Sequence, residues 1–192
     1  MKTIARKPRI WYPGSIYHVT CRGNRREAIF YREEDYEYFL YLVDETKRKW
    51  PFELHAYCLM TNHVHLLVQT DHHPQYMMKM LESQYAVYFN KKYRYEGHLF
   101  QGRYKSEIIT DRNYFLTVSR YIHLNPVKAK MVARPYEYPW SSYASYIYPT
   151  DCPRITTDRL LSCLPHPPRA FYQYYVEVSK KDIESYLKQT FD

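Results

Sequence analysis

Residues 61–68 read TNHVHLLV and place two histidines, one residue apart, inside an otherwise apolar run that is typical of a β-strand. Side chains alternate between the two faces of a strand, so His63 and His65 point to one face and Val64 and Leu66 to the other. Two imidazoles spaced by roughly 7 Å of strand can bind one divalent ion. The pattern predicts a strand with an apolar core face and a second face that carries either a metal site or a pair of exposed histidines.

The flanking sequence predicts strands at residues 15–22, 52–60 and 104–110, and helices at 33–50 and 74–93. The short link at residues 61 and 62 predicts a hairpin. The order strand, helix, strand, strand, helix, strand is the ferredoxin-like split βαβ arrangement, an α+β fold. We expect an antiparallel sheet with two helices on one face and the other face free, and we expect the histidines to line the free face.

A third helix and an appendage follow this unit. Asp111 is expected to cap a helix that runs to about Asn125, where Pro126 should make the helix stop or fray. Prolines multiply beyond Arg134, which predicts an irregular C-terminal appendage that is partly helical between residues 170 and 191. We therefore expect a main domain at residues 1–148 and an appendage at 149–192.

Composition favours a polyanionic partner. The chain has 192 residues, with 28 Lys and Arg against 20 Asp and Glu, and a formal net charge of +8. Such a charge promotes binding to nucleic acid through the release of counterions. The 24 tyrosines also offer flat surfaces on which unpaired bases can stack, although most tyrosines in a chain of this size serve packing.

The cysteines and the hydropathy pattern exclude other classes. The four cysteines form no C-x-x-C pair and no secretory signal precedes them, so neither a zinc ribbon nor a disulfide framework is indicated. No apolar run approaches the roughly 18 residues that span a bilayer. We expect a protein of a reducing cytoplasm that makes no membrane contact.

The third predicted helix carries a second feature of interest. Tyr121 and Asn125 lie four residues apart and therefore on one helix face. An amide oxygen can complete a metal site begun by two histidines, and a phenol one turn away can serve as a nucleophile beside the same ion. Asn125 could equally be a simple helix cap. Tyr31 and Tyr41 also have an oxygen ligand four residues on, but they belong to a helix that should pack behind the sheet, so position favours Tyr121.

The chain resembles the HUH single-strand transposases that use one catalytic tyrosine, and most closely the REP-associated tyrosine transposases of bacteria. The resemblance covers roughly the first three quarters of the chain. The matching blocks, in order, are YHVTCRGN at 17–24, YCLMTNHVHLL at 57–67, FQGRYK at 100–105, RYIHLNPVKA at 120–129 and WSSY at 140–143. The family usually ends the fourth block with Ala-Gly, whereas this chain has Ala129-Lys130.

The resemblance implies a reaction and roles for four residues. His63 and His65 would bind a divalent metal, Mg²⁺ or Mn²⁺, with Asn125 as the third protein ligand and Tyr121 as the nucleophile. Residues 1–148 would form the catalytic domain. The substrate would be single-stranded DNA that forms imperfect palindromic hairpins, cleaved through a covalent 5′-phosphotyrosine in the bacterial cytoplasm, in association with the nucleoid. The enzyme would act as a monomer or a homodimer.

Basic side chains are the candidates for contacts to DNA phosphates, which position a strand rather than read its sequence. We expect these contacts at Arg22, Arg25, Arg26, Arg103 and Lys105, with Lys91, Lys92 and Arg94 as further candidates. The sequence does not identify the general base. His123 lies on the helix of Tyr121 but off its face, so a structural role is favoured.

Two other functions compete with this one. RNA-recognition domains share the ferredoxin-like topology and stack bases on the aromatic side chains of an open sheet, so a nucleic-acid-binding module without chemistry is the alternative. Histidines, however, occupy the strand positions where aromatic residues would be expected. A hydrolase of the amidohydrolase type also uses an H-x-H pair, but it needs a barrel of about 250 residues.

Overall fold

The computed structural model describes residues 11–150 and 152–178. Its four strands form one antiparallel sheet in the order β2-β3-β1-β4. The strands are β1 Ser15–Arg22, β2 Glu53–Met60, β3 His63–Thr70 and β4 Lys105–Ile109. Every predicted strand end within this sheet agrees to one or two residues, and the strand order confirms the ferredoxin-like arrangement.

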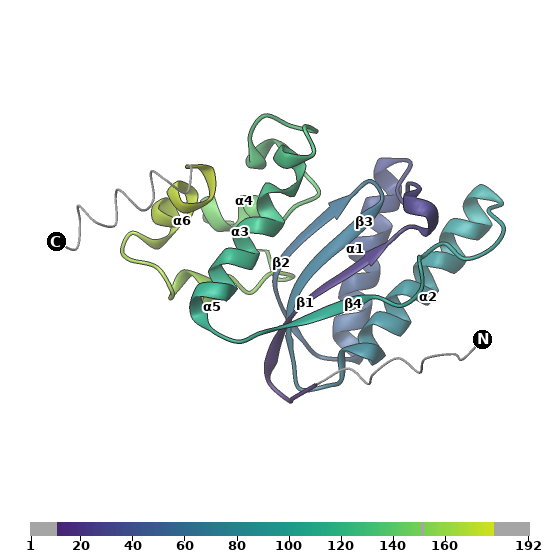
Figure 1. Cartoon of the computed structure of the whole chain (residues 1–192), viewed down its shortest axis with the longest axis horizontal. Coiled ribbons are helices and arrows are strands. Elements are labelled where there is room, and N and C mark those ends of the chain that lie inside the picture. Colours follow the sequence, from purple (N-terminus) through teal and green to yellow (C-terminus); the bar gives the residue numbers. More distant parts are fainter. Residues whose placement is uncertain (1–10, 151, 179–192) are drawn as a thin grey trace, which may run out of the picture.

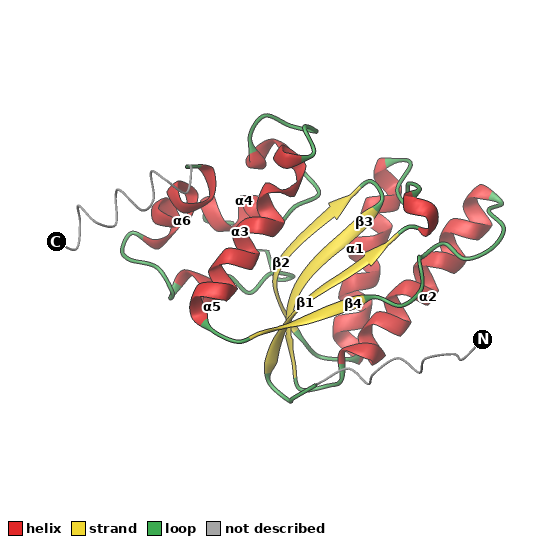
Figure 2. Ribbon diagram, viewed as in Figure 1, coloured by secondary structure: helices red, strands yellow, loops and turns green. Residues whose placement is uncertain are grey.

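Two helices cover one face of the sheet. Helix α1, Glu33–Lys49, and helix α2, Pro74–Tyr93, lie side by side behind the strands (Figures 1 and 2). Val64 of β3 is fully buried, as the apolar side of its strand requires. The carboxylate of Asp35 accepts hydrogen bonds from the backbone N–H groups of Tyr31 and Arg32 at 2.8 and 3.0 Å, which fixes the start of α1.

The opposite face is partly covered, so the prediction that this whole face is free is wrong. Helix α3, Arg112–Lys128, packs against β2 and β3 (Figure 1). Phe115 of α3 meets the ring of His55 on β2 with centroids 5.2 Å apart, and Val118 and Ile122 are buried. Burying the apolar stripe of a helix lowers the free energy of the folded state, and this face of the sheet offers a surface against which the stripe can be buried.

Helix α3 also runs past the predicted end at Asn125, through Pro126 to Lys128. A proline removes one backbone N–H, and in the last turn of a helix this loss affects a single hydrogen bond. The next bond persists, because the N–H of Ala129 donates to the carbonyl of Asn125 at 2.9 Å. Lys130, where the resembled family has glycine, follows with φ of 57°, the left-handed conformation that glycine adopts most easily.

The chain after α3 lies along the edge strand β2. The N–H of Leu59 donates to the carbonyl of Trp140 at 2.9 Å, and the N–H of Ser142 donates to the carbonyl of Tyr57 at 3.0 Å. The helices of this segment are η2 Pro135–Glu137, α4 Tyr143–Ile147, α5 Asp158–Leu161 and α6 Pro168–Glu177. Since these contacts join an irregular segment to the sheet, they hold the C-terminal region against the main domain.

Helix α6 packs on α3, and its presence confirms that the predicted appendage is partly helical. Tyr172 and Val176 of α6 are buried. The guanidinium of Arg120 on α3 donates to the carbonyls of Tyr175 and Val178, both at 2.7 Å. Residues 179–191 of the predicted helical stretch lie outside the described residues, and the domain boundary at 148/149 stays a prediction. Within residues 11–150 and 152–178, no helix is long and apolar enough to cross a membrane.

Candidate active site

Strands β3 and β1, adjacent at the centre of the sheet, bring three imidazoles together on the face that α3 partly covers. His63 and His65 lie on one face of β3, as their spacing predicts, with ring centroids 4.9 Å apart. His18 of β1 stacks on His65 at 5.1 Å, and its Nε2 lies 2.9 Å from Nδ1 of His65. His65 is buried, whereas His63 and His18 are partly buried.

The sequence analysis missed His18. The ferredoxin-like order places the first strand beside the histidine strand, so a polar side chain within residues 15–22 was the available signal. Contact with His65 depends, however, on the register of the two strands, which pairs Thr20 with His65 and His18 with Leu67. Register between strands far apart in sequence follows from tertiary packing and could not be predicted from either strand.

Tyr121 lies beside these imidazoles. It projects from α3 with 41% of its surface exposed, and its ring centroid lies 5.4 Å from His65 and 6.0 Å from His18. The ammonium group of Lys128, two turns further along α3, lies 4.7 Å from the centre of the Tyr121 ring. The structure therefore places an accessible phenol between the imidazoles of His18 and His65 and a cation, all within one chain.

Asn125 lies one turn beyond Tyr121 on α3 and is nearly buried. Its Nδ2 donates to the backbone carbonyl of Tyr121 at 2.8 Å. Among the described residues, no hydrogen bond joins Asn125 to His63 or His65. The structure thus shows Asn125 inside the helix rather than at a cap, with its amide nitrogen already engaged.

The competing tyrosines lie elsewhere. Tyr31 precedes α1 and Tyr41 lies on it, and this helix packs on the sheet face opposite the histidines. Asp35, the oxygen ligand four residues after Tyr31, is buried and binds Lys92 at 2.7 Å. These pairs are therefore separated by the sheet from the imidazole cluster.

All three imidazoles of the cluster are held neutral. Burial lowers the pKa of His63 to about 4, and the positive charge of Arg22 acts in the same direction. Burial lowers the pKa of His65 well below its ordinary value, with the neighbouring His18 and His63 contributing. Burial also lowers the pKa of His18, against the opposing negative charge of Glu107. Neutral imidazoles keep a lone pair, which is the form that binds metals.

The buried Nε2 of His65 has no hydrogen-bond partner in the part of the chain that the structure describes. A buried polar atom left unpaired costs about 1–3 kcal/mol, so its persistence suggests a ligand. Among the described residues, no group of three His, Cys, Asp or Glu side chains is arranged so that all three could hold one metal ion. Two imidazoles with room for oxygen ligands fit an ion such as Mg²⁺ or Mn²⁺ that also takes amide, phosphate or water oxygens.

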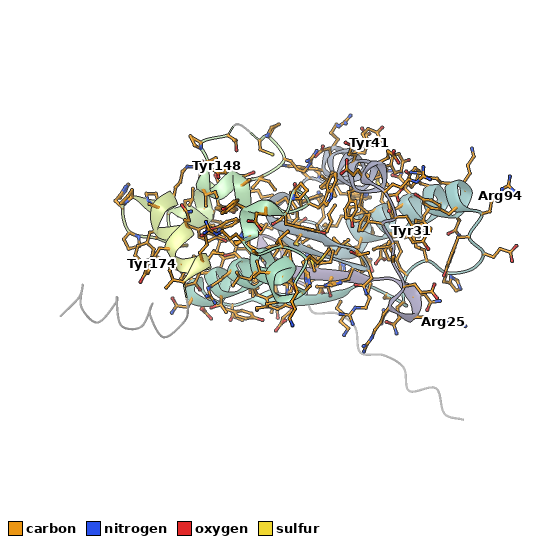
Figure 3. The ribbon with its side chains drawn as sticks, turned by 90° about the horizontal axis from the view of Figure 1, so that it is seen from above. Arg25, Tyr31, Tyr41, Arg94, Tyr148 and Tyr174 are labelled. Carbon is orange, nitrogen blue, oxygen red and sulfur yellow. The ribbon has the colours of Figure 1, made fainter. Side chains whose placement is uncertain are left out.

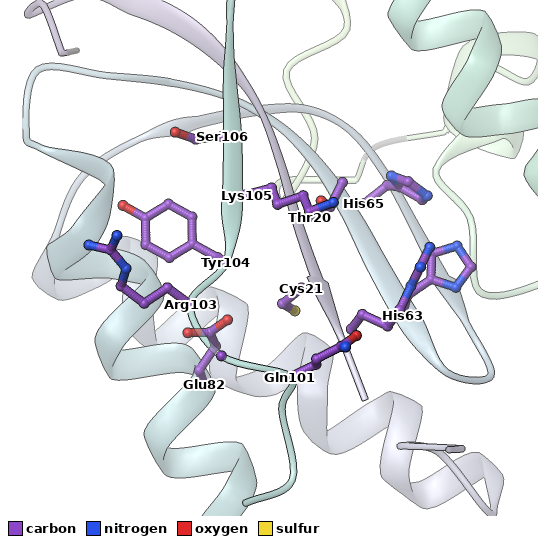
Figure 4. A pocket seen from close by; sticks show the side chains of 12 residues that line it. Thr20, Cys21, His63, His65, Glu82, Gln101, Arg103, Tyr104, Lys105 and Ser106 are labelled. Carbon is purple, nitrogen blue, oxygen red and sulfur yellow. The ribbon is translucent and has the colours of Figure 1, made fainter. Parts of the chain in front are cut away.

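A pocket of about 790 Å³ opens beside the two histidines of β3. His63 and His65 lie on one side of it and Arg103 on the other (Figure 4). Arg22 and Lys105 also line the pocket, and all three basic side chains are exposed. Three of the five predicted DNA-contact residues are therefore grouped around a single opening that leads to the imidazoles.

The other two predicted DNA contacts lie outside this pocket. Arg25 and Arg26 form the short helix η1, Asn24–Arg26, where both adopt positive φ. Arg25 projects from an outer edge of the molecule (Figure 3). Of the further candidates, Lys92 is engaged by Asp35 on the helix side of the sheet.

His123 has the structural role that its position favours. It is fully buried, and its two ring nitrogens lie 2.7 Å from the Tyr172 hydroxyl and 2.8 Å from the Ser142 hydroxyl. Burial lowers the pKa of His123 to about 3. Both nitrogens are thus used to join α3 to the C-terminal segment.

Comparison with known proteins assigns the chain to a family. The family described as "Transposase IS200 like" matches residues 12–125, which include both β3 histidines and Tyr121. A protein of Haemophilus influenzae whose name assigns it to the REP-associated tyrosine transposases is 32% identical over 124 residues, or 56% of this chain and 70% of that protein.

A solved structure shares the fold. The structure of a REP-associated tyrosine transposase bound to a REP hairpin superposes with a TM-score of 0.64 and 20% sequence identity. The match covers 80% of this chain and 98% of the other. The chain therefore belongs to the IS200-like transposases, and within them to the REP-associated tyrosine transposases, which cleave and transfer DNA strands.

Proposed function

We propose that this protein is a metal-dependent transposase and endonuclease for single-stranded DNA, which cleaves and rejoins hairpin-forming palindromic repeats through a covalent 5′-phosphotyrosine. The position of Tyr121 carries the proposal. Its exposed phenol ring lies 5.4 Å from the ring of His65, whose buried Nε2 lacks a partner among the described residues. A nucleophile next to two imidazoles that can hold a metal ion suits the cleavage of a phosphodiester.

His63 and His65 would hold the Mg²⁺ or Mn²⁺ ion, with the Asn125 amide oxygen as third ligand. When bound, the ion would supply Lewis acidity at a non-bridging oxygen of the scissile phosphate. The pKa of His63 at about 4 supports this role, because the imidazole is unprotonated at neutral pH. The hydrogen bond from Asn125 Nδ2 to the Tyr121 carbonyl supports it too, since it restrains the amide.

Tyr121 would attack the scissile phosphorus in line through its phenolic oxygen. The new bond joins this oxygen to phosphorus, and the bond from phosphorus to the 3′ oxygen breaks. The phenol loses its proton and the departing 3′ oxygen gains one, which leaves a 5′-phosphotyrosine and a free 3′-hydroxyl.

The proposed linkage also explains strand transfer. A phosphotyrosine is still a phosphodiester, so a second 3′-hydroxyl can attack it and rejoin the strands without ATP. The tyrosine oxygen is then the leaving group and recovers its proton. The same residues therefore serve both cleavage and joining.

Hairpin DNA is the proposed substrate because the structurally similar REP-associated tyrosine transposase has been solved bound to a REP hairpin. The charge of this chain supports a DNA substrate, because the net charge is +8 and the pocket beside the histidines is lined by Arg22, Arg103 and Lys105. Such side chains would bind phosphates and guide the strand toward Tyr121.

Covalent capture tests the proposal. A labelled single-stranded hairpin with its flanking sequence is incubated with the protein and Mn²⁺, and the products are separated on a denaturing gel. We expect a shifted covalent adduct with the wild type and none with Tyr121→Phe, while both retain hairpin binding in a native gel. Tyr41→Phe is the matched control, because Tyr41 is also exposed, at 50%, but lies on α1.

Two results would contradict the proposal. An adduct that survives in Tyr121→Phe would remove Tyr121 as the nucleophile. Hairpin retention by the wild type without any adduct, with Mg²⁺ or Mn²⁺, would favour the nucleic-acid-binding module that performs no chemistry.

A further inference from the structure

An imidazole binds a metal ion only through an unprotonated nitrogen. A neutral histidine has one N–H and one lone pair, so the partner of one nitrogen decides whether the other is available. In metal sites this partner orients the ring and tunes its basicity. The structure shows a partner for one nitrogen of each histidine on β3.

The partner of His63 is Asn62. Nδ1 of His63 lies 2.7 Å from Oδ1 of Asn62. The orientation of this amide is set from its other end, because Nδ2 of Asn62 donates to the carbonyl of Arg26 at 2.9 Å. An amide oxygen can only accept, so the proton of the bond to His63 belongs to Nδ1. Nε2 of His63 is then the nitrogen that carries the lone pair.

The backbone holds Asn62 in place as well. Its carbonyl accepts a hydrogen bond from the N–H of Gly23 at 2.8 Å, which ties the β2–β3 turn to the end of β1. Arg26, whose carbonyl orients the amide, has φ of 65° in η1. The left-handed backbone of η1 therefore presents the carbonyl of Arg26 to the Asn62 amide as a hydrogen-bond acceptor.

The partner of His65 is His18, with Nε2 of His18 2.9 Å from Nδ1 of His65. Either ring could donate, and the surroundings of His65 assign the proton to its Nδ1. The other nitrogen of this ring, Nε2, is buried without a partner among the described residues, so a proton there would be a donor without an acceptor. Nδ1 of His65 then donates to Nε2 of His18.

We propose that Asn62 and His18 are positioning residues that fix the tautomers of His63 and His65, so that both histidines present an unprotonated Nε2 to the metal ion. This inference rests on the metal site of the proposed function and adds two residues to it. Neither residue touches substrate in this scheme. Each acts through the imidazole that it orients.

The tautomers can be measured in the protein without metal. Histidine labelled with ¹⁵N distinguishes an Nδ1–H ring from an Nε2–H ring by NMR, with signals assigned through His63→Gln and His65→Gln. We expect both residues as Nδ1–H in the wild type, with the tautomer of His65 changing in His18→Ala and that of His63 in Asn62→Ala. An Nε2–H ring at His63 or His65 in the wild type would overturn the proposal, and this measurement requires no variant of His18 or Asn62.

Metal affinity provides the second readout. Free Mn²⁺ is followed by electron paramagnetic resonance during titration of each folded variant. Loss of a partner that orients a ligand weakens metal binding by about 10–100-fold, which we expect for His18→Ala and Asn62→Ala. His18→Gln and Asn62→Asp, which each keep a hydrogen-bond acceptor at the position, should bind Mn²⁺ nearly as the wild type does.

A matched control is a buried imidazole away from the cluster. His55 on β2 has both nitrogens engaged, at 3.1 Å from the carbonyl of Thr156 and 3.3 Å from Oε1 of Gln69. His55→Gln should leave Mn²⁺ affinity unchanged. Equal losses in His55→Gln and His18→Ala would overturn a specific role for His18.

The outcomes separate this inference from the function on which it rests. If His63→Ala abolishes Mn²⁺ binding while His18→Ala and Asn62→Ala bind as the wild type does, the metal site stands and the positioning role is overturned. If the wild type binds no Mn²⁺, or His63→Ala binds it equally well, the proposed metal site fails and the positioning role falls with it.

Discussion

Helix α3 carries one buried imidazole, His123, and contacts a second, His65, through Tyr121, and the two imidazoles differ in one respect. His123 has both ring nitrogens paired, with the hydroxyls of Tyr172 and Ser142. His65 has only Nδ1 paired, with His18, and its Nε2 is buried without a partner among the described residues. Burial lowers the pKa of both histidines, so both are neutral at pH 7.

The difference separates a structural imidazole from a functional one. A buried polar group with all partners satisfied stabilises a fold and specifies its packing. A buried group with one open nitrogen lowers stability unless a ligand completes it. The paired cluster, which consists of His123, Tyr172 and Ser142, joins α3 to the C-terminal segment, whereas the open cluster, which consists of His18, His63 and His65, lies beside Tyr121.

The largest expected effect comes from His65→Leu, which removes the open nitrogen. Cleavage should fall roughly 10³-fold, because a metal ion contributes several kcal/mol to the stabilisation of the transition state. The free energy of unfolding should stay close to that of the wild type, since an unpaired buried group is replaced by an apolar one. Single-turnover cleavage and urea unfolding measure the two quantities. A strongly destabilised variant would show that His65 is a structural residue like His123.

The reciprocal change is His123→Leu. We expect the free energy of unfolding to fall by about 2–4 kcal/mol, because the hydroxyls of Tyr172 and Ser142 lose their buried partner. Cleavage per folded molecule should change little, because His123 faces away from the proposed site. Urea unfolding followed by circular dichroism gives the first value and active-site titration the second. An unchanged unfolding midpoint would show that His123 does not stabilise the fold, contrary to the structural role assigned to it.

The unfolding free energy should fall at acid pH because of the buried histidines of both clusters. The folded pKa values of His63, about 4, and His123, about 3, lie below the ordinary value of 6.5. Below pH 6.5 the unfolded chain therefore binds protons that the native state does not, so stability falls as pH falls and is fully present above pH 6.5. Between pH 6.5 and 5 each such histidine should cost up to about 2 kcal/mol. Between pH 6.5 and 5, the unfolding free energy of His123→Leu should change less steeply with pH than that of the wild type. An identical pH dependence would refute the lowered pKa of His123.

A smaller effect is expected from Tyr172→Phe, which removes one hydroxyl from the paired cluster. That hydroxyl lies 2.7 Å from His123 and donates to Ser119 at 3.1 Å. We expect a loss of about 1–2 kcal/mol in unfolding free energy, less than for His123→Leu, because one buried partner is lost rather than two. Thermal unfolding provides the comparison. A larger loss of unfolding free energy than in His123→Leu would show that Tyr172, rather than His123, contributes most to the stability of the paired cluster.

The smallest effect concerns the basic side chains near the open cluster. Arg103→Ala should weaken hairpin binding and reduce the slope of log K against log salt by about 0.7–0.9, as one phosphate contact is lost. Arg25→Ala should change this slope less, because Arg25 lies outside the pocket. Binding measured over a range of salt concentrations tests the pair. Equal slopes for both variants would mean that the strand extends over η1.

Much of the fold could be predicted because its signals are local. The alternation of His63 and His65 with apolar residues sets the faces of β3, and helical spacing sets α1 and α2. The packing of α3 on the second face of the sheet was not predicted, since the apolar stripe of a helix does not specify the surface against which it packs. The run of α3 through Pro126 was missed for a related reason, because packing can outweigh the local preference of one residue.

The sequence by itself determined the order of the elements, the H-x-H pair and the candidate tyrosine, because periodicity and motif spacing reside in consecutive residues. Only the tertiary structure decided that His18 meets His65, that the carbonyl of Arg26 accepts a hydrogen bond from the Asn62 amide, and that Tyr121 rather than Tyr41 lies beside the histidines. These contacts depend on strand register and on helix docking between segments far apart in the chain. Both are set by the packing of the whole core, which no short stretch of sequence specifies.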